Sequence, residues 1–65
     1  MKQNYIIQEV QDIDSQRGGV TYYGTIQAAK TKAVQEQMRA GNILKICDVS
    51  GKMVCYKKDG KWHAV

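Results

Sequence analysis

Apolar and polar positions alternate along the first quarter of the chain with a loose period of two. Residues 4–13 are rich in β-branched and aromatic side chains, and this alternation is typical of a strand. Residues 14–19 contain two adjacent glycines and other turn-forming residues. Residues 20–25 form a second short apolar and aromatic run that reaches Gly24. The pattern predicts an antiparallel hairpin over this part of the chain.

The pattern changes to a helical period over residues 25–41. Thr25 is a good N-cap residue, because its hydroxyl can accept a hydrogen bond from an unpaired backbone N–H. Arg39 would lie in the last turn, and Gly41 would follow as the C-cap. The helix would present one stripe of small and apolar residues, flanked by Val34 and Met38: Ile26, Ala29, Ala33 and Ala40. Such a stripe lets a helix lie close against a sheet.

Residues 42–65 predict a meander of three strands. Two dipeptides, Ser50-Gly51 and Asp59-Gly60, are typical of two-residue hairpin turns, and Asp-Gly is the stronger signal. The whole chain therefore predicts one α+β domain over residues 1–65, with a small, mainly antiparallel sheet, the order β-β-α-β-β-β, and one helix packed on one face. The N-terminal hairpin has two open placements: it extends the sheet, or it covers the face opposite the helix.

Two-residue turns would fix the register of the C-terminal strands. The expected cross-strand pairs are Ile46 with Cys55, Cys47 with Val54, Tyr56 with His63, and Lys57 with Trp62. Because side chains alternate across a sheet, two faces follow. The first is a core face, with Leu44, Ile46, Met53, Cys55, Trp62 and Ala64. The second carries Ile43, Lys45, Cys47, Val49, Lys52, Val54, Tyr56, Lys58, Lys61, His63 and Val65.

Charge adds a functional hypothesis to this picture. The net charge is +4, and residues 43–65 carry five lysines against two aspartates. This excess indicates nucleic acid or an acidic protein as a partner, although basic charge also serves solubility. The second face would gather the candidate nucleic-acid-binding residues: Lys45, Lys52, Tyr56, Lys58, Lys61 and His63. Lysines beside an aromatic ring can bind phosphates and stack a base.

A second hypothesis uses the apolar residues of the same face. Ile43, Cys47, Val49 and Val54 would be unusual on a purely solvated surface. They, or an unpaired sheet edge, could dock a protein partner or a second copy of the chain. The sequence therefore leaves a nucleic-acid-binding module and a protein-interaction or homo-oligomerisation module as alternatives.

Catalytic, metal and cofactor chemistry find little support. Cys47 and Cys55 are the only cysteines, and only His63 could join them, which is too few ligands for structural zinc. In the expected register the two cysteines point to opposite faces, so we expect no disulfide between them, a core position for Cys55 and an exposed thiol at Cys47. We expect a non-enzymatic protein without a cofactor. No apolar run is long enough to span a membrane and no secretory signal is visible, which favours a cytoplasmic protein.

Overall fold

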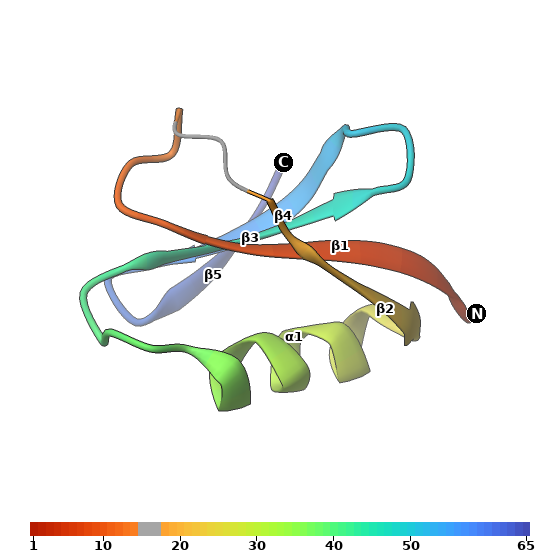
Figure 1. Cartoon of the computed structure of the whole chain (residues 1–65), viewed down its shortest axis with the longest axis horizontal. Helices are drawn as coiled ribbons and strands as arrows, with labels where there is room; N and C mark the ends of the chain where they lie inside the picture. The colour runs from red at the N-terminus through yellow and green to blue at the C-terminus, as the bar shows by residue number, and fades with distance from the viewer. Residues whose placement is uncertain (15–17) are drawn as a thin grey trace.

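The computed structural model describes residues 1–14 and 18–65. Its elements follow the order expected from the sequence, and their bounds are β1 (Gln3–Val10), β2 (Val20–Gly24), α1 (Ile26–Glu36), β3 (Ile43–Asp48), β4 (Met53–Lys58) and β5 (Lys61–Ala64). Every strand pairing is antiparallel, and the strands lie in the order β2-β1-β3-β4-β5. The helix packs on one face of this twisted sheet (Figure 1). The predicted α+β fold is confirmed.

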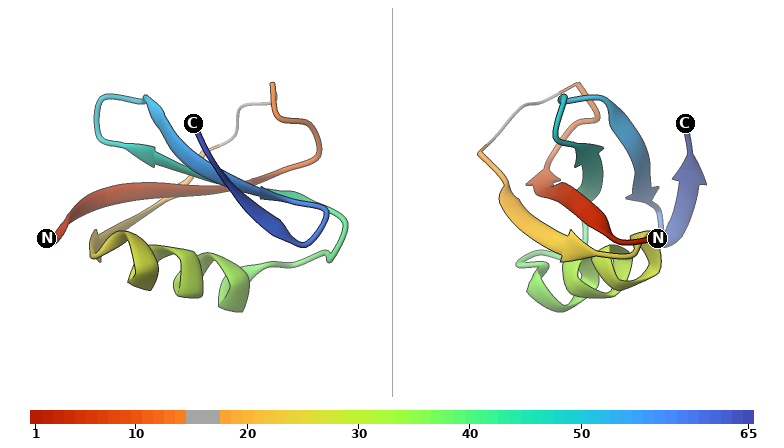
Figure 2. Two further views of the ribbon diagram at one scale, coloured as in Figure 1. Left: turned by 180° about the vertical axis from the view of Figure 1, so that it is seen from behind. Right: turned by 90° about the vertical axis from the view of Figure 1, so that its right-hand side faces the viewer.

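The N-terminal hairpin extends the sheet. Strand β1 pairs with β2 on one side and with β3 on the other, so the first strand of the chain lies inside the sheet. Ile7 faces Val20 across one pairing and Ile46 across the other. Figure 2 shows how the sheet twists from β2 at one edge to β5 at the opposite edge. The first of the two placements left open by the sequence is the one observed.

The core lies between the sheet and the helix. Ala29 and Ala33 are fully buried, and their small side chains bring α1 close to the strands. We call the side of the sheet that faces α1 the helix-side face. Its buried residues are Tyr5, Ile7, Leu44, Ile46 and Cys55. The helix backbone lies close to β1, β2 and β3, and the Lys30 side chain extends from it to Trp62 on β5.

Trp62 lies at the margin of this core, as the expected register requires. It is half-buried against the core cluster. The ammonium of Lys30 lies 5.5 Å from the centre of its ring, a cation–π distance. Tyr22 and Tyr23 lie on opposite sides of β2: Tyr22 packs against the core, and Tyr23 is exposed.

The helix begins where the sequence predicts and ends earlier. The Thr25 hydroxyl accepts a hydrogen bond from the Ala28 amide at 3.1 Å, which confirms the N-cap. The helix ends at Glu36, and Gln37 is already extended, with φ −63° and ψ 127°. The prediction that the helix reaches Gly41 is wrong.

A carboxylate from β1 explains the early end of the helix. Glu9 accepts hydrogen bonds from the Met38 amide at 2.8 and 3.0 Å and from the Arg39 amide at 2.9 Å. The side-chain amide of Asn42 donates a further hydrogen bond at 2.8 Å. Two backbone donors that would otherwise continue the helix are thus bound to a charged acceptor. We call this arrangement the Glu9 clamp.

The first C-terminal turn also differs from its prediction. Cys47 pairs with Met53, not with Val54, and the register shifts between Ile46 and Cys47. The connection is one residue longer than a two-residue turn, and one extra residue in β4 restores the expected pairing of Ile46 with Cys55. Val54 packs against the core as a result.

Asp48 is the physical reason for the longer turn. Its carboxylate accepts hydrogen bonds from the Ser50 hydroxyl, from the Ser50 amide at 2.9 Å and from the Lys52 amide at 3.1 Å. Gly51 adopts φ 92°, which suits glycine. These bonds lower the pKa of the Asp48 carboxyl, chiefly through the Ser50 hydroxyl.

The second turn is as predicted. Asp59 and Gly60 both have positive φ, 54° and 80°, as a two-residue hairpin turn of this kind requires. The pairs Tyr56 with His63 and Lys57 with Trp62 follow. The register of β4 and β5 is therefore confirmed.

We expect Glu9→Ala to lower the free energy of unfolding by about 1–2 kcal/mol, because hydrogen bonds to a charged acceptor are lost. Glu9→Gln should fall between this variant and the wild type, since it keeps one acceptor oxygen. Urea denaturation measures both. Glu36→Gln is the matched control, because it breaks only a surface ion pair and should change stability by at most about 0.5 kcal/mol. If Glu9→Ala loses no more stability than Glu36→Gln, the clamp does not stabilise the fold.

Asp48→Asn should destabilise the protein at neutral pH. A carboxyl whose pKa is lowered by folding stabilises the native state above its unfolded pKa, and this contribution disappears as the pH falls through the folded pKa. The stabilities of variant and wild type, measured by denaturation between pH 7 and pH 2, should therefore converge at the acidic end. Asp12→Asn, at an exposed carboxylate, should stay close to the wild type at pH 7. A difference for Asp48→Asn that is independent of pH would contradict this assignment.

Candidate interaction surfaces

The face of the sheet that points away from the helix carries most of the predicted site residues. We call it the open face. A row of side chains crosses it, since Gln8 pairs with Lys45, Lys45 with Tyr56, and Tyr56 with His63. The Tyr56 and His63 rings stack, with centres 5.0 Å apart and planes at 22°. Lys58 and Lys61 form the next pair beside this stack.

The structure brings together only part of the predicted site. Lys58, Lys61 and His63 are exposed at the β4–β5 hairpin, next to the half-buried Tyr56. Lys45 is in the same row but is only 8% exposed, because β3 is paired on both sides. We call Tyr56, Lys58, Lys61 and His63 the hairpin patch.

Lys52 is not part of the hairpin patch. It follows the turn that leads into β4, whereas Lys58 ends that strand. Six strand residues span about 20 Å. The expectation that Lys52 joins the other lysines on one surface is therefore not met, because the turn places it at the far end of β4.

The apolar part of the open face is largely buried. Ile43 and Cys47 are inside the molecule, and Val54 packs against the core. Gln11, Asp12, Ile13 and Asp14, from the connection that follows β1, enclose a hollow together with Ile43 and Lys58. Of the four residues expected to dock a partner from this face, only Val49 is exposed, at 69%.

The two cysteines are both buried and unpaired, and they lie on opposite faces of β3 and β4. The expectation of an exposed thiol at Cys47 is wrong, since its residue is only 6% exposed. Burial raises the pKa of the Cys55 thiol. Both thiols are therefore structural groups.

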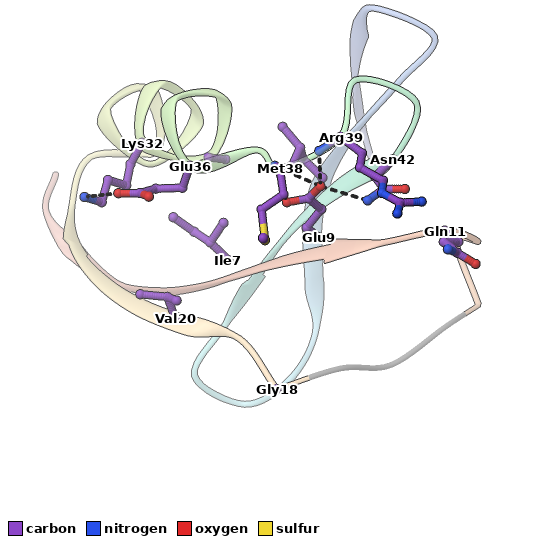
Figure 3. Close-up of a pocket in the computed structure, with 12 residues that line it drawn as sticks. Ile7, Glu9, Gln11, Gly18, Val20, Lys32, Glu36, Met38, Arg39 and Asn42 are labelled. Carbon is purple, nitrogen blue, oxygen red and sulfur yellow. Dashed lines mark hydrogen bonds and ion pairs between the residues drawn. The ribbon is translucent and has the colours of Figure 1, made fainter.

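A groove on the helix side was not predicted from the sequence. It has a volume of about 720 Å³ and lies between β1, β2 and the C-terminal half of α1 (Figure 3). Its apolar lining comes from Ile7, Val20, Ala33, Met38 and Leu44. Met38 is 89% exposed. Met38 flanks the apolar stripe expected for the helix, and this was the one signal in the sequence for an apolar surface here. Because α1 ends before Met38, that part of the expected stripe is not packed against the sheet.

The rim of this groove is polar. The Lys32 ammonium lies 2.9 Å from the Glu36 carboxylate, which raises the pKa of Lys32 through a hydrogen bond and charge attraction. Glu9 lies at the other end, with its carboxylate in the clamp (Figure 3). Arg39 and Asn42 complete the rim.

Within residues 1–14 and 18–65, no three histidine, cysteine, aspartate or glutamate side chains are grouped to hold a metal ion. Over the same residues, no helix has the length and apolar character needed to cross a bilayer.

The fold and its surfaces define a small α+β domain with exposed surfaces for binding. No protein-family model and no curated protein matches the sequence. A solved structure does: that of AcrIF9, an anti-CRISPR protein, is 40% identical to this chain, with a TM-score of 0.90. The match covers 100% of this chain and 88% of the other. The chain therefore belongs to the AcrIF9 family.

Proposed function

We propose that this protein is an anti-CRISPR protein that acts by binding a CRISPR effector complex. The observation that carries the proposal is the match to AcrIF9 along the whole chain, at 40% identity and a TM-score of 0.90. A small binding protein can inhibit such a complex by occupying a surface that DNA recognition needs.

Physical properties of the chain support inhibition by binding. The chain has 65 residues, and its described part holds no metal-ligand cluster and only two buried thiols. Among the described residues, His63 is stacked on the Tyr56 ring and has no hydrogen-bond partner that would orient it for proton transfer. We therefore infer a non-enzymatic mechanism.

The net charge narrows the mode of binding. A protein that imitated DNA would need an acidic surface, because CRISPR effectors hold nucleic acid in a positively charged channel. This chain has a net charge of +4. A positive net charge is therefore inconsistent with imitation of DNA by this protein. The protein instead contacts an uncharged or acidic protein surface, or nucleic acid held by the complex.

The first test is a phage-infection assay in cells with an active CRISPR system of type I-F, the type that the designation AcrIF9 denotes. Expression of the protein should restore plaque formation by a targeted phage to near the level seen in cells without the system. Ile46→Asp, which puts a charge at a fully buried position, should abolish the effect through loss of the fold. If the wild-type protein accumulates in folded form and plaque formation stays suppressed, the proposal fails.

The hairpin patch supports a nucleic-acid contact within this function. The stacked Tyr56 and His63 rings offer an aromatic surface, and Lys58 and Lys61 lie beside them across the β4–β5 pairing. Such a pairing of cations with aromatic rings suits a weak contact that is independent of base sequence. We propose that this patch contacts the backbone of DNA or RNA.

Replacement of both Lys58 and Lys61 by Gln should weaken binding to a mixed-sequence oligonucleotide. It should also reduce the salt dependence, with a change in slope of about 1.5–2, because two phosphate contacts are lost. Fluorescence anisotropy at several salt concentrations measures both quantities. The double variant Lys2→Gln/Lys52→Gln is the matched control, since it removes the same charge from the other end of the sheet. Equal losses in the two double variants would show that net charge, and not the hairpin patch, governs binding.

A further inference from the structure

The two edges of the sheet differ in how they are protected from further strand pairing. Strand β5, at one edge, has four residues and carries Lys61 and His63. Short length and lysine are both common protections of an edge strand. Strand β2, at the other edge, has the sequence VTYYG, with no charge and no proline. Its backbone edge is therefore open to another strand.

Apolar side chains are exposed along the same edge. Val20 is 63% exposed and points to the helix side, as its pairing with Ile7 requires. Tyr23 is exposed on the other side of the strand. A β-branched residue and an aromatic residue on an uncharged edge form a surface suited to strand addition.

The groove is continuous with this edge. Val20 and Gly18 line one wall, and Lys32, Glu36 and Met38 come from the opposite wall (Figure 3). A strand paired with β2 would place every second side chain on the helix side of the sheet. Those side chains would lie over the apolar floor of the groove.

The charges on the rim indicate the chemistry of the occupant. The Glu36 carboxylate is paired with Lys32, and the Glu9 carboxylate is engaged by the amides of the clamp. Arg39 has no ion pair within the described residues, since the Lys32–Glu36 pair is the one found there. The Arg39 guanidinium is therefore open to an incoming group, and a guanidinium prefers a carboxylate partner.

We propose that the β2 edge and the groove bind an extended segment of a protein subunit of the CRISPR effector complex. The segment adds to β2 through backbone hydrogen bonds, inserts an apolar side chain between Val20 and Met38, and places a carboxylate at Arg39. This inference rests on the proposed function and names the surface through which the protein partner is bound. Backbone pairing and apolar contact hold the two proteins together even where much of the effector surface is basic.

The test is binding of the purified protein to the purified effector complex, with two matched variants. Val20→Lys puts a charge at the groove mouth and should weaken binding at least about tenfold, a loss of about 1.4 kcal/mol. Val49→Lys makes the same change at an equally exposed valine in the β3–β4 connection and should bind within about twofold of the wild type. Arg39→Gln should also weaken binding. Thermal melts of each variant confirm that the fold is kept.

Amide hydrogen exchange supplies an independent reading of the same complex. Amides of residues 20–24 should gain protection when the effector is bound. A complex in which Val20→Lys binds as tightly as the wild type, or in which protection is confined to β4 and β5, overturns the inference and leaves the proposed function intact. If the wild-type protein does not bind the effector, both fail. Protection of β2 that rises with protein concentration in the absence of effector identifies a second copy as the occupant and also overturns the inference.

Discussion

The central position of β1 is the constraint on which the rest of the structure depends. Strand β1 pairs with β2 and β3 at once, so residues at the start of the chain connect the N-terminal hairpin to the C-terminal meander. Both faces of β1 bury apolar side chains, Ile7 toward the helix and Val10 on the open face. Near its C-terminal end β1 also carries Glu9, whose carboxylate binds the backbone amides of the segment between α1 and β3. One strand thus sets the sheet order, the core and the end of the helix. Such pairing between distant parts of the chain carries a loop-closure cost in entropy.

Local signals predicted local structure well, and side chains from elsewhere in the chain account for what they missed. Thr25 and Asp59-Gly60 act on their immediate neighbours, and both behave as the sequence indicates. The end of α1 was misplaced because Glu9, about thirty positions earlier, binds the amides that a longer helix would use. The register at Cys47 was predicted wrongly because the Asp48 side chain binds the backbone of the turn and makes it one residue longer. The Ser-Gly dipeptide alone does not indicate this length.

The candidate site was predicted in part for a similar reason. Alternation along β4 and β5 correctly placed Tyr56, Lys58, Lys61 and His63 together, because a single tight turn governs that register. Lys45 lies on the face that the same alternation predicts. Its burial depends on the position of β3 inside the sheet, which the alternation of side chains along a strand does not indicate. The groove arises because α1 ends before the apolar residues that follow it. No sequence motif predicts that position for the end of the helix.

The reach of the helix has a consequence for the motions of the molecule. The backbone of α1 lies against β1, β2 and β3, so the β4–β5 hairpin is joined to the rest by its pairing with β3 and by side-chain contacts at the margin of the core, among them Lys30 with Trp62. A unit held in this way opens locally at a lower free energy than the whole domain unfolds. We therefore expect the hairpin patch to lie on a part of the protein that opens more readily than the core, which would let it adjust to an irregular ligand.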